Sequence, residues 1–253
     1  MPDPTIAPAH SAPGAAGGPD AKLGFFIPCL NEGRSIGGVV TAIRRHFPGA
    51  PVVVVDDGST DDTQRLALAA GAYCIRLASN MGIATASMVG MACCVELGCE
   101  LIVRLDGDGQ HAIADVDALI RAWRESGADL VTGSRYLRGE TYTTPFRQLG
   151  IVVLRFLLRF LYGIRVTDPT SGFRLYTGAT ARWLLGRRYP VDYPEAEELA
   201  DLCLARRFKI HEAAVSTNPR VEGTSSITPF QSGYFMLKVC SSLLLRRVLV
   251  LWS

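Results

Sequence analysis

The chain has 253 residues, of which 48% are hydrophobic and 20% are charged, enough for one large or two small globular domains with a sizeable core. Its 26 Lys and Arg residues against 24 Asp and Glu residues leave a formal charge of +2, so nucleic acid is not an expected partner. Collagen-like, coiled-coil and disordered classes are excluded for most of the chain.

The first segment and the cysteines indicate a cytosolic protein. Residues 1–21 are rich in Pro, Ala and Gly and contain no Lys or Arg and no apolar run, which predicts a flexible tail rather than a cleavable export signal. The seven cysteines contain no C-x-x-C pair, so neither a complete disulfide framework nor a zinc ribbon is indicated. A reducing compartment fits these features best.

From residue 23 onward, short apolar runs alternate with helical patterns. Strands are predicted at residues 23–29, 51–55, 73–77, 101–105 and 129–132. Helical spacing of apolar residues, or a capping-box-like start, predicts helices at residues 36–47, from 61, at 85–97 and at 116–123. This alternation predicts an α/β fold with a doubly wound, Rossmann-like, mostly parallel sheet and helices on both faces, which we assign to one domain over residues 22–227.

Two later segments are apolar but carry arginines. Residues 149–166 are interrupted by Arg155, Arg159 and Arg165, and residues 228–253 carry Lys238, Arg246 and Arg247 among bulky apolar side chains. Because a central arginine opposes insertion across a bilayer, both segments are predicted to be amphipathic helices at the periphery of the fold. They fit a membrane surface, and the alternative for each segment is a core helix whose arginines reach solvent.

Acidic residues follow two of the predicted strands. Asp56 and Asp57 come directly after residues 51–55, and the sequence Asp106-Gly107-Asp108-Gly109-Gln110-His111 follows residues 101–105. Ligands of open α/β sheets bind at the carboxyl ends of the strands, so these acids are placed where a ligand is expected. Two carboxylates at D-x-D spacing can face one hard cation, and Mg²⁺ prefers one or two carboxylates with phosphate oxygens completing its shell. The sequence therefore predicts a metal-bridged diphosphate ligand.

Five motifs follow one another along the chain. They are Ile27-Pro28-Cys29-Leu30-Asn31-Glu32, the run from Val55 to Thr63 (VDDGSTDDT), Asn80-Met81-Gly82, the Asp106 to His111 motif and Thr170-Ser171-Gly172-Phe173-Arg174. Taken in this order, they resemble the motifs of family-2 inverting glycosyltransferases with the GT-A fold. The branch that they most resemble is the dolichyl- or polyprenyl-phosphate glycosyltransferases, and the resemblance covers about residues 23–227.

The resemblance implies a nucleotide-diphospho-sugar donor and a divalent ion, Mg²⁺ or Mn²⁺. It assigns the donor site to Pro28, Asn31, Glu32, Asp57, Asn80 and Asp106, with Asp57 bonded to the base and Asp106 lying against the nucleotide sugar. It assigns the metal to Asp108 and Gln110, beside Asp106, and it makes Asp106 and Asp108 catalytic residues. The metal-dependent transferase implied in this way is a hexosyltransferase.

The resemblance also implies a binding site for the phosphate of a lipid acceptor. Four residues match that branch, namely Arg135, Ser171, Arg174 and Arg220. Arginine suits the task because its planar guanidinium binds phosphate through two parallel hydrogen bonds. Glu195 and Glu197 are the candidates for a catalytic base, although an ionised phosphate acceptor hardly needs one.

The sequence departs from the family in two respects, and these limit the predicted function. The Q-x-x-R-W motif and the E-D pair of processive members are absent, as are the C-terminal spanning helices of some relatives. We therefore expect transfer of one sugar to a polyprenyl- or dolichyl-phosphate lipid, by an enzyme bound peripherally to the inner face of the membrane or to a membrane partner protein. The alternatives are transfer to a glycan hydroxyl during cell-envelope polysaccharide assembly and a non-catalytic, receiver-like Mg²⁺-binding module.

Overall fold

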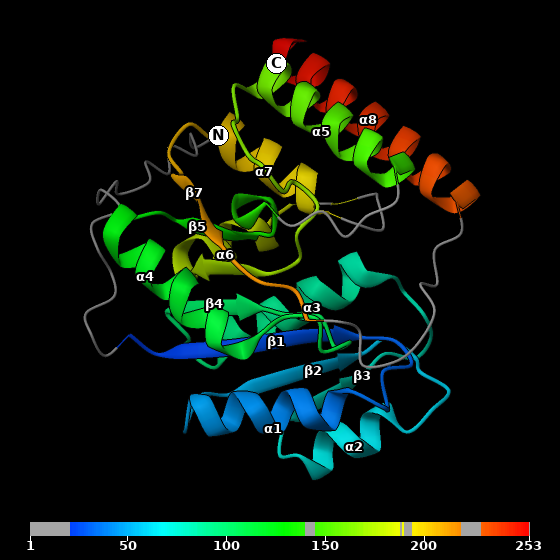
Figure 1. Ribbon diagram of the computed structural model, residues 1–253, viewed down its shortest axis with the longest axis vertical. Helices are drawn as coiled ribbons and strands as arrows, with labels where there is room; N and C mark the ends of the chain where they lie inside the picture. The colour runs from blue at the N-terminus through cyan, green and yellow to red at the C-terminus, as the bar shows by residue number, and fades with distance from the viewer. Residues whose placement is uncertain (1–20, 140–144, 188, 190–193, 219–228, 253) are drawn as a thin grey trace, which may run out of the picture.

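A seven-stranded sheet forms the centre of the molecule (Figure 1). The computed structural model describes residues 21–139, 145–187, 189, 194–218 and 229–252. Within them the strand order is β3-β2-β1-β4-β6-β5-β7, and every pairing is parallel except those of β6. The strands are β1 (Leu23–Cys29), β2 (Val52–Asp56), β3 (Tyr73–Arg76), β4 (Leu101–Arg104), β5 (Leu130–Ser134), β6 (Arg174–Thr177) and β7 (Ile210–Ala214).

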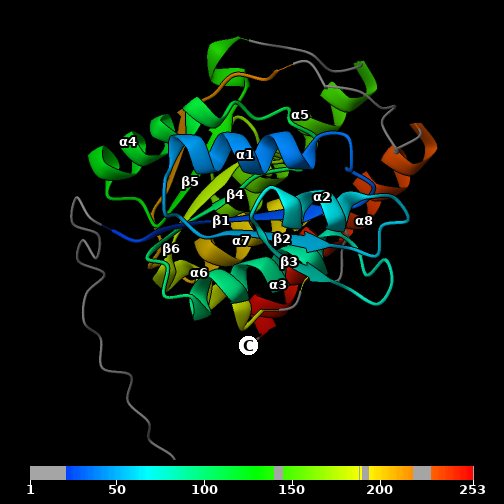
Figure 2. The ribbon, with the colours of Figure 1, turned by 90° about the horizontal axis from the view of Figure 1, so that it is seen from below.

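Helices cover both faces of this sheet and bury one core on each side (Figures 1 and 2). One face carries α1 (Ile36–His46), α2 (Thr63–Ala69) and α4 (Val116–Ser126). The other carries α3 (Ile83–Glu96), α6 (Gly178–Leu185) and α7 (Glu195–Leu204). The mostly parallel α/β sheet predicted from the sequence is confirmed, because the apolar run of β2 is buried on both faces, as parallel strands require.

The alternation in the sequence did not predict β6 or α6. β6 pairs antiparallel with both β4 and β5, which places Arg174 directly opposite Arg104. Its four residues, Arg174–Thr177, begin and end with a polar side chain and do not form an apolar run, and they follow the turn-forming T-S-G-F sequence. β6 therefore brings the Thr170 to Arg174 motif to the edge of the sheet where β4 ends.

The two basic apolar segments form a pair of helices outside α7. The helices α5 (Pro145–Tyr162) and α8 (Pro229–Trp252) lie side by side in Figure 1, and both pack on α7. Their inner faces are buried, and their outer faces expose large apolar side chains, namely Leu149, Val152, Val153, Phe156, Phe160, Tyr234, Leu237, Leu244, Leu245 and Val248. Each segment thus forms a peripheral amphipathic helix, as predicted, although α5 begins before residue 149 and ends at Tyr162, short of residue 166.

In the part of the chain that the structure describes, no helix is long and apolar enough to cross a bilayer. The predicted tail (residues 1–21) lies almost wholly outside the described residues, as does the proposed boundary between residues 227 and 228. The division of the chain at these two points stays a prediction.

Candidate active site

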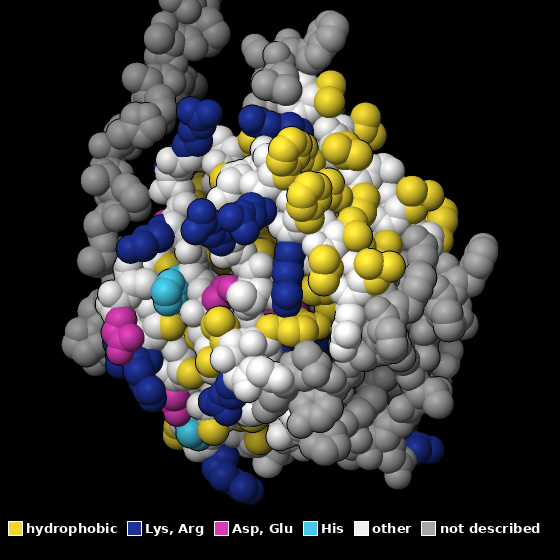
Figure 3. Space-filling view, turned by 45° about the horizontal axis from the view of Figure 1, so that its top comes forward, with side chains coloured by type: hydrophobic (Ala, Val, Ile, Leu, Met, Phe, Trp, Pro, Cys, Tyr) yellow, Lys and Arg dark blue, Asp and Glu magenta, His cyan; other side chains and the backbone are white. Residues whose placement is uncertain are grey.

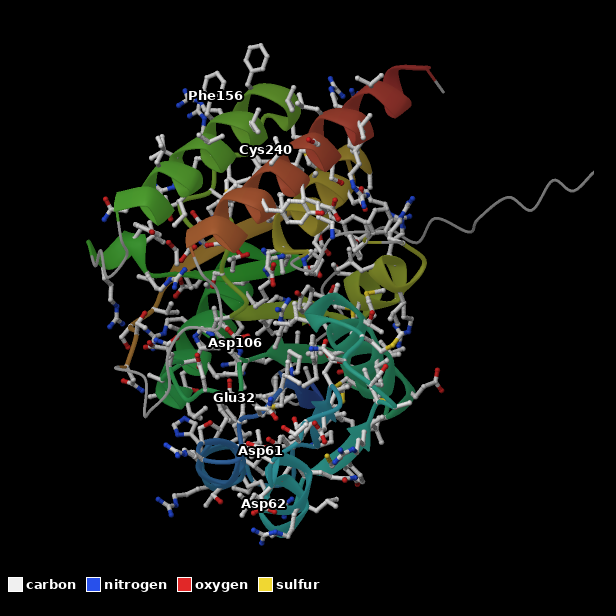
Figure 4. The ribbon with its side chains drawn as sticks, turned by 90° about the vertical axis from the view of Figure 1, so that its right-hand side faces the viewer. Glu32, Asp61, Asp62, Asp106, Phe156 and Cys240 are labelled. Carbon is white, nitrogen blue, oxygen red and sulfur yellow. The ribbon has the colours of Figure 1, made fainter. Side chains whose placement is uncertain are left out.

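The candidate site lies where β2, β1 and β4 end, three strands that are neighbours in the sheet. Glu32 follows β1, Asp57 follows β2 and Asp106 follows β4, so parallel strands bring the three predicted acids to one edge. Figure 4 shows Glu32 and Asp106 at this edge, with Asp61 and Asp62 beyond them on the loop before α2. The structure therefore brings together side chains that lie up to 74 positions apart in the sequence.

The loops after β1 and β2 are locked together by side chain to backbone hydrogen bonds. The Asn31 backbone N–H donates to Ser59 Oγ at 2.8 Å, and Thr60 N–H donates to Asn31 Oδ1 at 2.9 Å. Asn31 has a φ of 57°, a left-handed conformation that Asn tolerates better than most residues. The Glu32 N–H donates to Thr63 Oγ1 at 2.8 Å, so Asn31 and Glu32 are held in fixed positions beside the predicted nucleotide site.

Asp57 is buried, and its carboxylate organises the loop before α3. Its Oδ1 accepts from Met81 N–H at 2.7 Å and its Oδ2 accepts from Gly82 N–H at 2.9 Å. Asn80 Oδ1 also accepts from Gly82 N–H at 3.1 Å, while Pro28 is buried within β1, opposite Val55. Asp57 therefore joins the second and third motifs, and its contact with a nucleobase stays a prediction.

The turn after β4 presents Asp106 and Asp108 on either side of Gly107. Asp106 Oδ2 lies 3.2 Å from His111 Nε2, and the His111 ring stacks on Phe173 with 4.7 Å between centroids. Desolvation raises the pKa of Asp106, but His111 and the charges of Arg104 and Arg135 outweigh it and hold that pKa well below its usual range. Asp106 is thus a fixed anion near neutral pH.

The oxygen atoms of this turn fit the divalent ion that the sequence predicts. Asp106 Oδ1 is buried and has no hydrogen-bond partner among the described residues, and Asp108 Oδ1 accepts from Gln110 N–H at 3.0 Å. Among the described residues, no group of three or more His, Cys, Asp or Glu side chains is arranged so that it could hold a metal ion by itself. This donor set suits Mg²⁺ or Mn²⁺, which would be held by Asp106 and Asp108, with substrate phosphate oxygens and water completing the shell. The contribution of the Gln110 side chain stays a prediction.

The two candidate bases on α7 have different surroundings. Glu195 Oε1 lies 2.6 Å from Arg104 Nη2, close to Asp106. Glu197 instead contacts α8, where it accepts from the Ser242 hydroxyl and pairs with Arg246 at 3.4 Å. The structure therefore places Glu197 against the neighbouring helix and not beside Arg104, because residues two apart on a helix project in different directions. Its role as a catalytic base stays a prediction that these contacts do not favour.

Arg135 lies at the same end of the sheet, held by Asp168. Its Nε and Nη2 donate to the two carboxylate oxygens at 2.8 and 3.2 Å, and it is near enough to lower the pKa of Asp106. Glu212 of β7 accepts from the backbone N–H groups of Thr167 and Asp168 at 2.8 to 3.0 Å. Arg155 of α5 donates to the Thr167 carbonyl, which ties the amphipathic pair of helices to this loop.

The structure separates the other predicted phosphate contacts. Arg174 is fully buried, and its guanidinium donates to Glu198 Oε2 at 2.8 Å, to the Glu195 carbonyl at 3.0 Å and to the Ser171 carbonyl at 2.9 Å. It does not fit the predicted contact with an acceptor phosphate, because all three of its nitrogens serve the protein interior. Ser171 is buried beside it, and its Oγ accepts from Phe173 N–H at 3.3 Å. Arg220 lies outside the described residues.

Sequence reasoning did not assign roles to Arg104, His111 and Asp168, although each contacts a predicted site residue. One signal was present, since Arg104 is the only charged residue within the apolar run of residues 101–105. A buried charge needs a partner, so an arginine inside a core strand indicates that carboxylates pack on that face.

The sequence of this chain was compared with protein families and with known proteins. The model of Glycosyl transferase family 2 matches residues 25–181. The polyprenol monophosphomannose synthase of Mycolicibacterium smegmatis is 32% identical over 166 residues, which are 62% of each chain. The UDP-N-acetylglucosamine--dolichyl-phosphate N-acetylglucosaminyltransferase of Methanococcus voltae is 25% identical and covers 86% of this chain and 96% of its own. These relatives confirm the resemblance to the lipid-phosphate branch.

Among solved structures, glucosyl-3-phosphoglycerate synthase from Mycobacterium tuberculosis, in complex with Mn²⁺, UDP-glucose and phosphoglyceric acid, superimposes with a TM-score of 0.69. The match covers 90% of this chain and 80% of the synthase at 21% identity, which supports the fold alone. The GT-A architecture expected from the sequence is thus confirmed. With the family model spanning residues 25–181, the chain belongs to Glycosyl transferase family 2.

Proposed function

We propose that this glycosyltransferase moves one sugar from a nucleotide-diphospho-sugar to a polyprenyl- or dolichyl-phosphate lipid at a membrane surface. The observation that carries the proposal is the exposed apolar face of α5 and α8, on helices that are tied through Arg155 to the loop holding Arg135. Figure 3 shows hydrophobic side chains gathered over these helices, with basic side chains beside them. A lipid with a charged headgroup matches both surfaces.

The proposed reaction is a direct displacement at the anomeric carbon. A phosphate oxygen of the acceptor forms a bond to this carbon while the bond to the nucleoside diphosphate breaks, and the configuration inverts. The divalent ion, held by Asp106 and Asp108, would neutralise charge on the departing diphosphate. Asn31, Glu32 and Asp57 would orient the donor, and Arg135 with Ser171 and Arg220 would hold the acceptor phosphate.

The ion pair between Glu195 and Arg104 favours a phosphate acceptor over a glycan hydroxyl. A hydroxyl acceptor needs a base to remove its proton, whereas an ionised phosphate attacks without one. Glu195 is the α7 carboxylate that pairs with Arg104, and it is buried in this ion pair at 2.6 Å. This pairing holds the carboxylate inside the protein, away from an incoming hydroxyl. The family match leaves no support for the alternative of a non-catalytic receiver-like module.

The donor half of the proposal is tested by a binding screen. UDP-, GDP- and dTDP-sugars are each added with Mg²⁺ or Mn²⁺, and the melting temperature is recorded. A bound ligand at 100 times its Kd adds about 2.7 kcal/mol to the free energy of unfolding. The donor found in this way is then incubated with polyprenyl phosphate, and the glycolipid product is measured by mass spectrometry. Failure of every metal–nucleotide-sugar pair to stabilise the protein would contradict the proposed donor class.

Asp57→Ala is expected to weaken nucleotide-sugar affinity by about tenfold and to change lipid binding much less. The carboxylate is proposed to accept from the base, and it also holds the loop at Met81 and Gly82. Calorimetry with the donor nucleotide measures the effect. Asp62→Ala is the matched control, because Asp62 lies on the same loop but pairs with Arg65 at the surface. Unchanged nucleotide affinity in the Asp57 variant would remove this residue from the proposed site.

The membrane half of the proposal is tested on α5. Phe156 and Phe160 stack with 5.8 Å between centroids and are 63% and 76% exposed. We expect the wild-type protein to co-sediment with vesicles of phosphatidylglycerol and phosphatidylcholine, and the Phe156→Ser/Phe160→Ser variant to bind at least about tenfold more weakly. Leu68→Ser, at an exposed apolar position on α2, is the control. Equal vesicle binding by wild-type protein and the double variant would exclude this face as the membrane contact.

A further inference from the structure

Two arginines lie side by side inside the sheet, on the face covered by α7. Arg104 of β4 and Arg174 of β6 are directly opposite each other in the antiparallel register, and both side chains are almost fully buried. Like charges in this position repel one another unless each is neutralised. The first turn of α7 supplies both counter-charges, since Glu195 pairs with Arg104 at 2.6 Å and Glu198 pairs with Arg174 at 2.8 Å.

The two arginines differ in how their donors are used. Arg174 satisfies all three nitrogens with Glu198 and with the carbonyls of Ser171 and Glu195. Arg104 uses Nη2 for Glu195, while its buried Nε and Nη1 have no partner among the described residues. Buried ion pairs are often no more stabilising than apolar residues of similar size. Arg104, with two nitrogens that lack partners among the described residues, is therefore expected to stabilise the fold no more than an apolar residue of similar size would.

Gly172 leaves room for Arg104 to face Asp106. A methyl group at Gly172 would lie 3.0 Å from Asp106 Oδ1 and 3.4 Å from Arg104 Nη2, so both groups border the same small space. Asp106 Oδ1 is itself buried without a partner among the described residues. Desolvation raises the pKa of Asp106, while the His111 contacts and the charge of Arg104 lower it. Arg104 thus stands between two carboxylates, Glu195 on α7 and Asp106 at the end of β4.

We propose that Arg104 is a positioning residue that acts through Asp106 and Glu195. From inside the sheet it fixes the Asp106 carboxylate at the carboxyl end of β4 and keeps Glu195 paired, so that the donor site is built before substrate arrives. The inference deepens the proposed function and rests on it where Asp106 is taken to contact the donor. The claim that Arg104 fixes the position of the Asp106 carboxylate does not depend on the donor, and it can be measured without a donor.

His111 provides a probe of Asp106 that needs no substrate. Its Nε2 lies 3.2 Å from Asp106 Oδ2, so displacement of the carboxylate changes the environment of the imidazole ring. The chain has only four histidines, and a His111→Gln variant assigns the His111 signal in an NMR spectrum of ring-labelled protein. We compare wild-type protein with Arg104→Met, Arg104→Lys and Arg246→Met. Arg246→Met is the matched control, because Arg246 also pairs with an α7 carboxylate, Asp201 at 2.7 Å, but lies on α8 and not in the candidate site.

The expected result is a shifted His111 signal in Arg104→Met, with kcat lowered by at least about tenfold and the donor KM changed less than about threefold. Arg104→Lys, which keeps a charge for Glu195, restores most of the signal and part of kcat. Arg246→Met lowers the melting temperature but leaves the His111 signal and kcat near wild type. Such a pattern distinguishes a role of Arg104 in positioning Asp106 from a mere loss of stability of α7.

Loss of Arg104 alone leaves Glu195 as a buried, unpaired charge, so an Arg104→Met/Glu195→Gln variant is measured beside it to secure a folded protein. An unchanged His111 signal and a kcat like that of Arg246→Met would overturn the inference. A shifted signal in a protein whose wild-type form transfers no sugar from any donor would leave Arg104 as the residue that places Asp106 and would contradict the proposed function instead.

Discussion

Asp108→Asn is expected to reduce sugar transfer by about 10²-fold or more while leaving the fold intact. The amide keeps an oxygen that can accept from Gln110 N–H, the 3.0 Å contact that shapes the turn, while the negative charge is lost. Asp108 lies on a loop at the end of a strand rather than within either apolar core. Asp108→Ala removes both the charge and the contact, and it should abolish transfer.

The measurement is kcat with saturating donor and acceptor, repeated after EDTA treatment and on return of Mg²⁺ or Mn²⁺. Asp129→Asn serves as the control, since Asp129 contacts Lys209 N–H far from this turn. Wild-type turnover by Asp108→Ala, or full activity of the wild-type enzyme after the metal is removed, would show that the proposed metal site is wrong.

Arg135→Ala is expected to raise the KM for polyprenyl phosphate by about tenfold or more and to leave donor affinity nearly unchanged. The side chain is 25% exposed and pairs with Asp168 through Nε and Nη2, a contact that does not engage Nη1. A charge-assisted hydrogen bond to phosphate is worth roughly 1.5 to 3 kcal/mol, which corresponds to this change in KM. Arg220, outside the described residues, is expected to behave in the same way when replaced by alanine.

Two controls distinguish binding of the acceptor from a structural role of Arg135. Arg138→Ala removes a neighbouring surface arginine, which pairs with Asp115 at 3.5 Å and has no proposed part in acceptor binding. Asp168→Asn weakens the pairing that holds Arg135 but leaves the charge of Arg135 in place. This variant should therefore raise the acceptor KM less than Arg135→Ala does. If all three variants show the same KM for polyprenyl phosphate as the wild-type enzyme, Arg135 does not bind the acceptor.

The sequence predicted the layers of the fold because parallel strands and their helices leave strong periodic signals. The apolar residues of β2 and the helical spacing on α1 are local patterns, and both elements form where they were expected. β6 was missed because its place depends on pairing with β4 and β5, which no local pattern records. The acids after β2 and β4 were found because strand ends can be read directly from the sequence.

The sequence could not distinguish among the charged residues of α7 and β6. Glu195 and Glu197 are two positions apart, yet one pairs with Arg104 beside the site and the other packs against Ser242 of α8. Arg174 belongs to a motif that resembles a phosphate site, but the register of β6 buries it among protein acceptors. Such assignments depend on which face of an element meets which neighbour, and only the assembled fold shows this.

The most direct test of the central claim compares two lipid acceptors that differ only in the phosphate. Purified enzyme with its nucleotide-sugar and Mn²⁺ receives polyprenyl phosphate in one assay and the corresponding polyprenol in the other, with a glycan hydroxyl acceptor as the third arm. We predict that the first assay yields glycosylated polyprenyl phosphate. The kcat/KM for polyprenyl phosphate should be at least about 10²-fold above that for the polyprenol or the glycan acceptor. Transfer to the glycan hydroxyl without transfer to polyprenyl phosphate would contradict the account.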